Sequence, residues 1–510
     1  MRSRARRLGV GCTLLGLAML ASSGCSYFSY PENPLLEASG SQADYRLRTV
    51  IPPTPGVEDD QTLVILTLSG GGTRAAALAY GVMRELDRGK IGGGSKSLLD
   101  EVDVISSVSG GSFAAAYYGL FGKRQFFEQF KPDVLNRSIE CDLILRMLAP
   151  WNWPRLLSPY FGRSDLASEY YDKHIFKGRT FADLPKRRPF IVLNAADMTL
   201  GAQFTFTQDD FDKLCSDLSA VHVARAVTAS SAFPGGFSPL TLNNYPKEDC
   251  GYRSPGWFAG AKADLDNVPS RFDRYATWKE YERDDRPYIH LFDGGLADNL
   301  GLRGAILALS STDSPWKLRD KIARKQIKRV VVIIVDAKPK AAPKQDRCAR
   351  PPGLLSVVMA SGTNPMENYS TDSVDLLENK FYEERRLHND WLTDQRRCTE
   401  FAAANCRGRR HRDDCEVKFR EGCETQFGVG KDSEVQTPDL YRIYVRFAAA
   451  DDSVRDRLNH IDTTLQLSAG DVNLLIDQGA VLLHKALRPK DGDSRDLVKD
   501  LGIEWKDDRP

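Results

Sequence analysis

A serine lies at the junction of an apolar run and a run of small residues. The segment Ser107–Gly111 reads Ser-Val-Ser-Gly-Gly; it follows the apolar run Val102–Ser106 and precedes the small-residue run Ser112–Gly119. This order predicts a strand, a tight turn and a helix, with Ser109 at the apex of the turn. The small flanking residues permit a strained backbone, so the Ser109 hydroxyl could face a bound carbonyl carbon as a nucleophile. The alternative role of Ser109 is to cap the following helix.

Two further turns carry the other groups that acyl transfer requires. Three consecutive glycines follow the apolar run 63–68, and they are Gly70, Gly71 and Gly72. Backbone N–H groups at a helix N-terminus are unshielded and suit a developing oxyanion, with Gly110 as a further donor. Downstream, the apolar run 288–292 ends at Asp293, which two glycines follow. The chain therefore offers a nucleophile turn, an anion-holding turn and a carboxylate turn, which are most of the parts of an acyl hydrolase.

Asp293 is the expected base for Ser109. A serine hydroxyl is a weak nucleophile at neutral pH and needs a base within hydrogen-bonding distance. A carboxylate, with an ordinary pKa of about 3.9, becomes an effective base only where burial raises its pKa. We expect Ser109 to attack an ester carbonyl while Asp293 takes the proton, and water activated by Asp293 to hydrolyse the acyl-enzyme. A purely turn-forming Asp-Gly is the alternative. His290 lies on the same predicted strand but points to the opposite face from Asp293.

Together, the three motifs in this order resemble the patatin-like phospholipases. The segment Ala229–Gly235, which reads Ala-Ser-Ser-Ala-Phe-Pro-Gly, and Asn299 resemble secondary signatures of that family. The likeness covers about 63–302, and we extend it to the helix predicted near Leu487. The resemblance implies a Ser-Asp dyad instead of a Ser-His-Asp triad. It also implies fatty-acyl esters of glycerophospholipids or lysophospholipids as substrates, with no metal and no cofactor.

The chain departs from the family pattern at three positions. Ser107 stands where the family has glycine before the nucleophile, and Ser69 stands where it has Asp before the glycine run. Ala75 replaces the glycine that follows the Arg. Ser107 and Ala75 are small, so the turns survive if their backbones accept a Cβ. Two other interpretations stay open: a lipid acyltransferase of the same mechanism, and a lipoprotein that binds lipids or envelope partners without turnover.

Two polar residues near these turns have two interpretations each. Arg74 either orders the glycine loop or contacts a phosphate, or else it makes a surface ion pair. Asn299 either braces the carboxylate turn or caps the helix that follows, and we expect the cap. The glycine run lacks the Gly-Lys-Ser/Thr of a Walker loop, so nucleotide binding is not expected.

The first 25 residues have the pattern of an export signal. Four arginines precede the apolar run Leu8–Ala21, which is too short to span a bilayer comfortably. The segment Ser22–Cys25 then resembles a bacterial lipoprotein box, with Ser22 in place of the usual Leu. We expect Cys25 to be acylated after cleavage, which would give an outer-membrane lipoprotein that faces the periplasm and meets the membrane surface through its lipid anchor. A soluble periplasmic or secreted protein and an uncleaved anchor are the alternatives.

Charge and cysteine content limit the class of protein. The net charge of +1 provides no field that would recruit nucleic acid, so we expect no nucleic-acid partner. Four cysteines cluster in a polar, Arg-rich stretch without a periodic apolar face: Cys398, Cys406, Cys415 and Cys423. In an exported protein this pattern favours disulfides, because the paired Cys-x-x-Cys spacing of a zinc site is missing. Apart from Cys12 in the signal and Cys25, the other four cysteines could also pair, with unknown partners: Cys141, Cys215, Cys250 and Cys348.

The elements needed to position these turns alternate along the chain. Strands are expected at 63–68, 102–106, 190–194, 288–292, 328–335 and 440–447, and helices at 74–86, 111–121 and 469–487. Such alternation predicts an α/β fold, a three-layer sandwich in which helices flank a central, mostly parallel sheet. In such folds ligands bind at the carboxyl ends of the strands, where all three turns are expected. The β-branched run Val330–Val335 predicts a strand buried on both faces.

We divide the chain into four parts. They are a signal peptide (1–25), a tether or surface-hugging extension (26–61), a patatin-like hydrolase domain (62–490) with a Cys-rich insertion at about 385–432, and a loose, charged tail (491–510). The Trp-rich segment 147–161 is either a lid over an acyl-binding pocket or core between helices. We expect core, and the alternative hypothesis is that Trp151 and Trp153 touch lipid.

Overall fold

The computed structural model describes residues 27–37, 45–50, 61–324, 326–340, 353–428, 437–488 and 496–505. The predicted signal peptide, Cys25 and Cys348 lie outside these residues. Within them, no helix is both long enough and apolar enough to cross a membrane.

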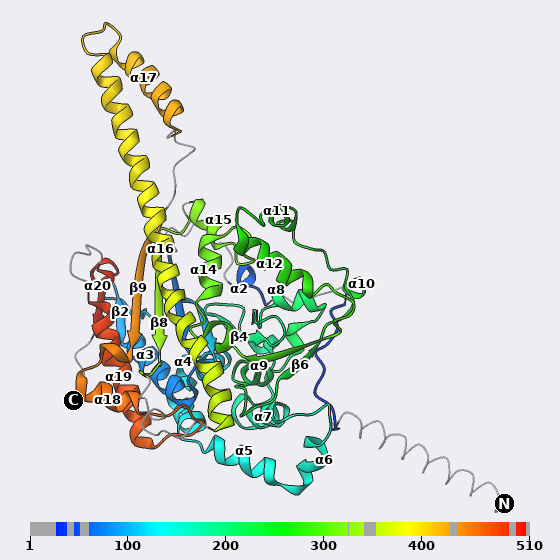
Figure 1. Ribbon diagram of the computed structural model, residues 1–510. Coiled ribbons are helices and arrows are strands. Elements are labelled where there is room, and N and C mark those ends of the chain that lie inside the picture. The colour runs from blue at the N-terminus through cyan, green and yellow to red at the C-terminus, as the bar shows by residue number, and fades with distance from the viewer. Residues whose placement is uncertain are drawn as a thin grey trace, which may run out of the picture.

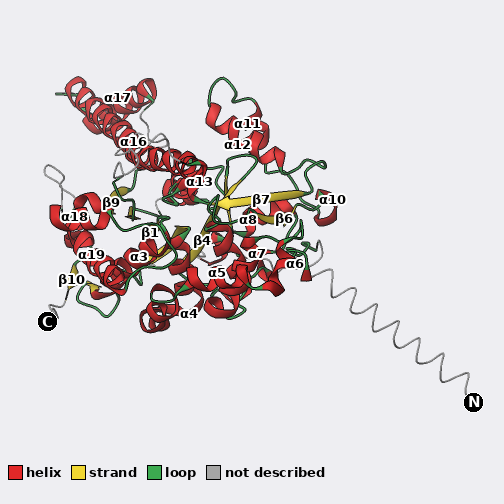
Figure 2. Ribbon diagram, turned by 60° about the horizontal axis from the view of Figure 1, so that its bottom comes forward, coloured by secondary structure: helices red, strands yellow, loops and turns green. Residues whose placement is uncertain are grey.

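One eight-stranded sheet forms the centre of the molecule (Figures 1 and 2). Its strands are β1 (Thr62–Leu68), β3 (Val102–Val108), β4 (Phe190–Asp197), β5 (Gln203–Thr205), β6 (Leu240–Asn243), β7 (Tyr288–Asp293), β8 (Arg329–Asp336) and β9 (Asp439–Arg446). The strand order is β6-β7-β4-β3-β1-β8-β9, with β5 paired to β4. Along this order all neighbours from β4 to β9 are parallel, whereas β7 is antiparallel to both β4 and β6, and β5 is antiparallel to β4. The predicted class, a mostly parallel sheet flanked by helices, is confirmed.

Helices flank this sheet and fill the connections between its strands. The longer ones in the body are α3 (Gly72–Arg88), α4 (Gly110–Phe130), α5 (Ile139–Leu148), α7 (Arg163–Tyr171), α9 (Val223–Ser230), α12 (Pro269–Glu280), α14 (Arg303–Ser310), α18 (Asp452–Asn459) and α19 (Ala469–Leu487). The shorter ones are α2 (Leu47–Val50), α6 (Trp153–Leu156), α8 (Gln208–Phe211), α10 (Lys247–Cys250), α11 (Phe258–Lys262), α13 (Gly295–Asp298), α15 (Leu318–Ala323) and α20 (Leu497–Asp500). A second, two-stranded sheet pairs β2 (Gly89–Ile91) with β10 (Ile503–Trp505).

The central strands are buried along their length, as their composition predicts. β3 and β4 are buried at every residue, and β8 at every residue after Arg329. Because helices cover both faces of such a sheet, these strands need not alternate polar and apolar residues. The predicted strands occur within three residues of their expected limits, and α19 has the limits expected for the last helix.

The predicted Cys-rich insertion is a helical hairpin that projects from the body (Figure 1). α16 (Leu354–Asn405) runs for 52 residues, and α17 (Arg412–Phe427) packs back along its far end. Disulfides join Cys398 to Cys423 and Cys406 to Cys415, so the disulfide prediction is confirmed and the zinc alternative is wrong. Where the hairpin projects from the body, most side chains of α16 and α17 face solvent. The sequence therefore shows no apolar periodicity that would predict these helices.

Two of the other four cysteines are also paired. Cys215 and Cys250 form a third disulfide, whereas Cys141 is exposed and has no disulfide partner among the cysteines that the structure describes.

The expectation that Trp151 and Trp153 are core residues is wrong. Their side chains are 72% and 52% exposed, respectively. Asn152 and Arg155 turn inward instead, because Asn152 donates to a carbonyl oxygen of α5 and Arg155 pairs with Glu169. These polar anchors orient the short turn so that both tryptophans face outward.

Both predicted extensions are partly attached to the body. In the N-terminal extension, the N–H of Tyr30 donates to the carbonyl of Tyr160 over 2.9 Å, and Asn33 is buried. In the C-terminal tail, α20 and β10 pack on the body with Leu497 and Ile503 buried. We expected the tail to be loose, but these buried apolar side chains hold part of it in a fixed position.

Candidate active site

The Ser109 turn is sharp and strained. β3 ends at Val108, α4 begins at Gly110, and Ser109 between them has φ 50° and ψ −119°. A positive φ is costly for a residue with a Cβ and is the conformation expected at the apex of a nucleophile turn. A Cβ on Gly110 would lie 2.0 Å from the carbonyl oxygen of Gly72. Glycine is therefore required where the nucleophile turn touches the glycine turn.

Ser230 holds the backbone of the nucleophile turn. The N–H of Ser109 donates to the hydroxyl oxygen of Ser230 over 2.9 Å, and the same hydroxyl bonds the Ser112 hydroxyl at 2.9 Å. Ser230 is buried at the end of α9, and its carbonyl accepts the N–H of Gly294 over 3.2 Å. One residue thus ties the nucleophile turn to the turn that carries Asp293.

Strand register brings Asp293 level with Ser109. β4 lies between β3 and β7; it pairs Val108 with Asn194, and Asp293 with the next residue, Ala195. β7 is antiparallel to β4, so it runs from the carboxyl edge of the sheet back toward the interior. Because β7 stops at Asp293, this residue stays level with the carboxyl end of β3. The nucleophile and carboxylate turns therefore meet across a single intervening strand.

The surroundings of Asp293 suit a general base. Its side chain is buried, and burial raises its pKa from 3.8 to about 6. The N–H of Gly295 donates to Oδ1 over 2.9 Å, and the nearby Ser109 side chain also favours the ionised form; both lower the pKa and so oppose the rise. A carboxylate with a pKa near 6 is a stronger base than an exposed one and is still ionised at neutral pH.

The glycine turn supplies fewer oxyanion donors than expected. The N–H of Gly70 donates to the carbonyl of Asn299 over 3.1 Å, so Gly70 is corrected from oxyanion donor to structural residue. The amides of Gly71 and Gly72 lie at the start of α3, and that of Gly110 at the start of α4, where helices have no internal acceptors. All four glycines line the same pocket as Ser109.

Arg74 is a buried residue in the first turn of α3, directly after the glycine loop. Its Nε donates to the carbonyl of Ala337 over 2.9 Å, and its Nη1 to the carbonyl of Ile461 over 2.6 Å. The loop is held from the same side by Thr464, whose carbonyl accepts the N–H of Thr73 over 2.8 Å. The loop-ordering interpretation is supported, and the surface ion pair is wrong because the side chain is buried.

Asn299 lies beside the carboxylate turn and does not cap the next helix. The residue before α14 is Leu302, and the carboxylate of Asp298 accepts the N–H of Arg303 over 2.7 Å. The Oδ1 of Asn299 is buried at the pocket without a hydrogen-bond partner among the described residues. A Cβ on Gly70 would meet this Oδ1 at 2.4 Å, so Asn299 lies between the glycine and carboxylate turns.

His290 does not join the site. Its Nδ1 bonds the Thr241 hydroxyl at 3.1 Å, on β6. Burial alternates along β7, with Ile289, Leu291 and Asp293 on the covered face and His290 on the other. The predicted orientation of His290 is confirmed.

The departures from the family pattern are accommodated. Ser69 accepts the N–H of Ala337 over 2.9 Å, so it connects the glycine turn to the end of β8. Ser107 has no positive φ and is buried, with its hydroxyl 3.1 Å from that of Ser112. Ala75 is buried next to Gly71.

The three turns open into a pocket of about 490 Å³. Ser109, Asp293 and the glycine loop form its polar end. Apolar side chains provide much of the remaining wall: Leu143, Ile144, Met147, Leu166, Phe233, Phe237, Met366 and Leu465. A pocket of this size and polarity fits a chain-like apolar ligand with one reactive polar group.

Sequence reasoning missed several residues of this site. Ser230 stood inside the segment 229–235, yet its contact with Ser109 was not foreseen. Met366 and Thr464 line the pocket from parts of the chain that carry no motif, so only the fold could reveal them.

Comparisons with known proteins find similarity over part of the chain. Residues 66–306 match a family model described as patatin-like phospholipase. No curated protein matches the chain. Among solved structures, human GIVD cytosolic phospholipase A2 matches with 15% identity and a TM-score of 0.31, over 57% of this chain and 45% of that chain. The chain thus spans less than half the length of that structure. Residues 66–306 are therefore similar in sequence to the patatin-like phospholipases.

Proposed function

We propose that this protein is a lipid acyl hydrolase of the phospholipase A or lysophospholipase type, with Ser109 as nucleophile and Asp293 as base. The observation that carries the proposal is the strand register that sets the buried carboxyl group of Asp293 level with Ser109 on one pocket. The match of residues 66–306 to the patatin-like phospholipases supports a lipid ester as the substrate.

Acylation begins at the Ser109 hydroxyl. As its oxygen bonds to the ester carbonyl carbon, the proton passes to Asp293, whose raised pKa makes it a competent acceptor. The bond to the leaving alcohol then breaks, and the alcohol takes the proton from Asp293. The product is an acyl-Ser109 ester and a free alcohol or lysolipid.

Deacylation uses the same residues in the opposite order. Asp293 takes a proton from water, the hydroxide oxygen bonds to the acyl carbon, and Ser109 leaves with that proton. In both steps the N–H groups of Gly71, Gly72 and Gly110 would hold the tetrahedral oxyanion. Removing one such donor typically costs about 10²–10³ in rate.

Acyl transfer is a second candidate because Asp293 is only 2% exposed. A dry site slows attack by water and allows a lipid alcohol to compete for the acyl-enzyme. The chemistry of acylation is unchanged, so analysis of the products distinguishes a free fatty acid from a transferred acyl chain.

The cellular location is a separate proposal. The lipoprotein box at Ser22–Cys25 supports acylation of Cys25 and attachment to the outer membrane, facing the periplasm. Mass spectrometry of the N-terminal peptide from membranes would show a diacyl or triacyl Cys25. An unmodified N-terminus beyond Cys25 would favour a soluble periplasmic or secreted protein.

Active-site labelling with a fluorophosphonate, together with ester hydrolysis, tests the dyad. The chain from Ser26 onward should be labelled and active, and Ser109→Ala should lose both properties. Asp293→Asn should lose hydrolysis at least about 10³-fold with the fold retained. Full activity in Asp293→Asn would place the base elsewhere, and an unlabelled, folded wild type would favour lipid binding without turnover.

A further inference from the structure

One short stretch of the chain exposes an unusual number of large apolar side chains. Between residues 144 and 160, seven of them are exposed: Ile144, Leu145, Leu148, Trp151, Trp153, Leu157 and Tyr160. Leu157 is the most open, at 84%, and Trp151 follows at 72%. We call these seven residues the α5–α6 patch. Soluble proteins rarely gather exposed apolar groups in this way unless another surface covers them.

The charge of this stretch has one sign. From Leu143 to Gly162 the charged residues are Arg146 and Arg155, and no acidic residue occurs. Arg155 is buried against Glu169, so Arg146 is the charge closest to solvent. Two nearby acids, Glu169 and Asp142, are each paired with an arginine. Exposed Trp and Leu in a stretch whose own charges are positive suit the interface of a phospholipid bilayer, where tryptophan is favoured.

The patch is continuous with the entrance to the candidate active site. Leu143, Ile144 and Met147 of α5 line the pocket, and Ile144 is at the same time 44% exposed. Leu145 and Leu148, on the outward side of the same helix, are 65% and 64% exposed. An acyl chain that leaves a membrane covering this patch would meet the pocket wall without crossing water.

The start of the described chain is fixed to the same place. Arg155 donates to the carbonyl of Tyr27, and the Ser158 hydroxyl donates to that of Phe28 over 2.7 Å. Tyr27 and Phe28 are themselves 48% and 38% exposed, so they extend the apolar surface. Cys25 is two residues before Tyr27, and two residues span at most about 7 Å. A lipid on Cys25 would therefore emerge beside the patch.

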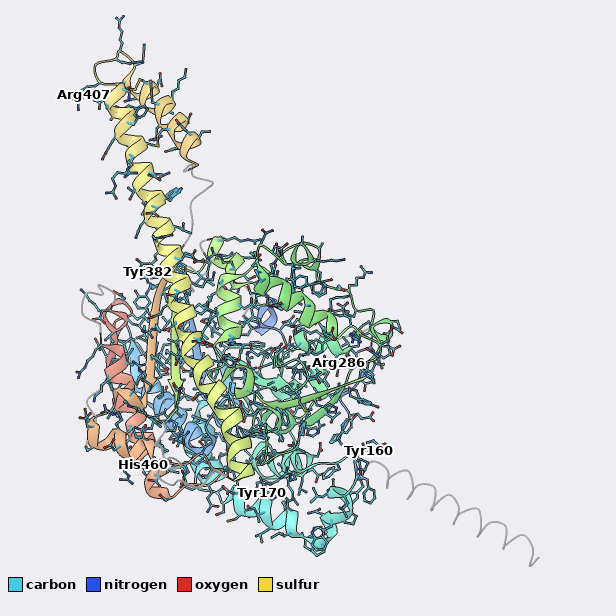
Figure 3. All side chains as sticks on the ribbon, in the orientation of Figure 1. Tyr160, Tyr170, Arg286, Tyr382, Arg407 and His460 are labelled. Carbon is cyan, nitrogen blue, oxygen red and sulfur yellow. A yellow bond between two sulfur atoms is a disulfide. The ribbon has the colours of Figure 1, made fainter. Side chains whose placement is uncertain are left out.

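We infer that the α5–α6 patch is a membrane-docking surface that lays the mouth of the pocket on a phospholipid bilayer, the one in which an acylated Cys25 would be anchored. This inference takes its substrate, a membrane lipid, from the proposed function. It adds the surface through which the enzyme would reach that lipid. The projecting α16–α17 hairpin lies at the other end of the molecule and would point away from the bilayer (Figure 1). In Figure 3, Tyr160 lies at the lower right of the body, and Tyr382 lies at the upper left, where α16 leaves the body.

Vesicle binding of the unlipidated protein tests the patch directly. The chain from Ser26 keeps every described element, which all lie between Tyr27 and Trp505. Vesicles of phosphatidylethanolamine and phosphatidylglycerol are sedimented with this chain carrying Ser109→Ala, so that no lipid is consumed. Adding Trp151→Ala, Trp153→Ala and Leu157→Ser should lower the vesicle partition coefficient about tenfold or more. Leu145→Ser with Leu148→Ser should lower it independently.

Matched controls separate docking from folding and from catalysis. Leu265→Ser with Tyr382→Ser removes comparably exposed apolar groups, 54% and 67%, and should bind vesicles like the parent chain. In the active background, the triple variant should keep its kcat/KM on a short, soluble ester and lose hydrolysis of vesicle lipid.

Several results would overturn the inference. Unchanged vesicle binding in both patch variants would do so, as would equal loss in the control variant. A wild-type chain that ignores vesicles but dimerises through the patch, seen by light scattering, would assign the surface to a second copy. Patch-dependent binding without any ester hydrolysis would reject the proposed function and leave the docking surface standing.

Discussion

The backbone N–H of Ser109 donates to the hydroxyl of Ser230 over 2.9 Å. This bond joins the nucleophile turn to the end of α9, and the carbonyl of Ser230 accepts the N–H of Gly294, next to Asp293. Ser230 therefore touches both halves of the candidate dyad through their backbones without facing the substrate carbonyl. It is a positioning residue.

Replacing Ser230→Ala should lower kcat about tenfold and leave KM nearly unchanged, because the Ser109 turn loses its anchor while the pocket wall is intact. Steady-state kinetics on a soluble ester measures this split. Thr228→Val on the same helix is the control, since its hydroxyl bonds only the Ala224 carbonyl among the described residues. Equal effects of the two substitutions would mean that α9 packing, and not the Ser109 anchor, is responsible.

The activity should fall in acid because Asp293 must be ionised to act as base. With its pKa raised to about 6, kcat/KM should drop about tenfold per pH unit below that value and level off above it. A pH–rate profile measured with a soluble ester checks the midpoint. A midpoint near 4 would show that burial does not raise the pKa of the working carboxylate.

Because Asp293 is buried, its ionisation lowers the free energy of unfolding. The folded-state pKa exceeds the ordinary value of 3.8, so the native state binds the proton more tightly and stability from this group falls as pH rises from about 4 to about 6. Asp293→Asn should therefore unfold with a free energy up to roughly 3 kcal/mol larger at pH 8, and little different at pH 3. Urea denaturation at both pH values measures the difference. A less stable variant at pH 8 would contradict this account.

Gly110→Ala should abolish activity and destabilise the protein by about 3 kcal/mol or more, because its Cβ would lie 2.0 Å from the carbonyl oxygen of Gly72. Thermal unfolding and fluorophosphonate labelling report the two effects. Gly256→Ala is the matched control, since a Cβ there meets no atom within 4 Å. A normal melting temperature for Gly110→Ala would mean that the two turns can move apart.

The disulfides of the α16–α17 hairpin should stabilise the hairpin itself and have little effect on activity at the candidate active site. Cys406→Ser with Cys415→Ser should expose the tip near Arg409 to trypsin many times faster, because a disulfide typically contributes about 2–4 kcal/mol. Hydrolysis of a soluble ester should stay within about twofold of wild type, since the pocket residue on α16, Met366, lies at the opposite end of that helix. Non-reducing peptide mapping confirms the pairs. A large loss of activity would show that the tip and the pocket are coupled.

Much of the fold was predictable from local sequence. The apolar runs that end at Leu68 and Ser106 predict strands because strands covered on both faces need continuous apolar or small residues, and the β-branched run 330–335 does the same for β8. The hairpin was not predictable in this way. Its cysteines indicated disulfides. Its helices bury few apolar side chains, so the sequence shows no apolar periodicity there, and the length of the helices could not be predicted.

The sequence by itself determined the nucleophile turn, the glycine turn and the carboxylate turn, because each depends on residues that are adjacent in the chain and on the small side chains that a sharp turn demands. Tertiary structure decided how they work together. The register across β4 sets Asp293 level with Ser109, the Asn299 carbonyl takes the N–H of Gly70, and burial sets the pKa of Asp293. Tertiary structure also turned Trp151 outward. Each of these outcomes depends on which distant segments become neighbours, and a hydrogen-bond partner, a pKa or an exposed face exists only once they do.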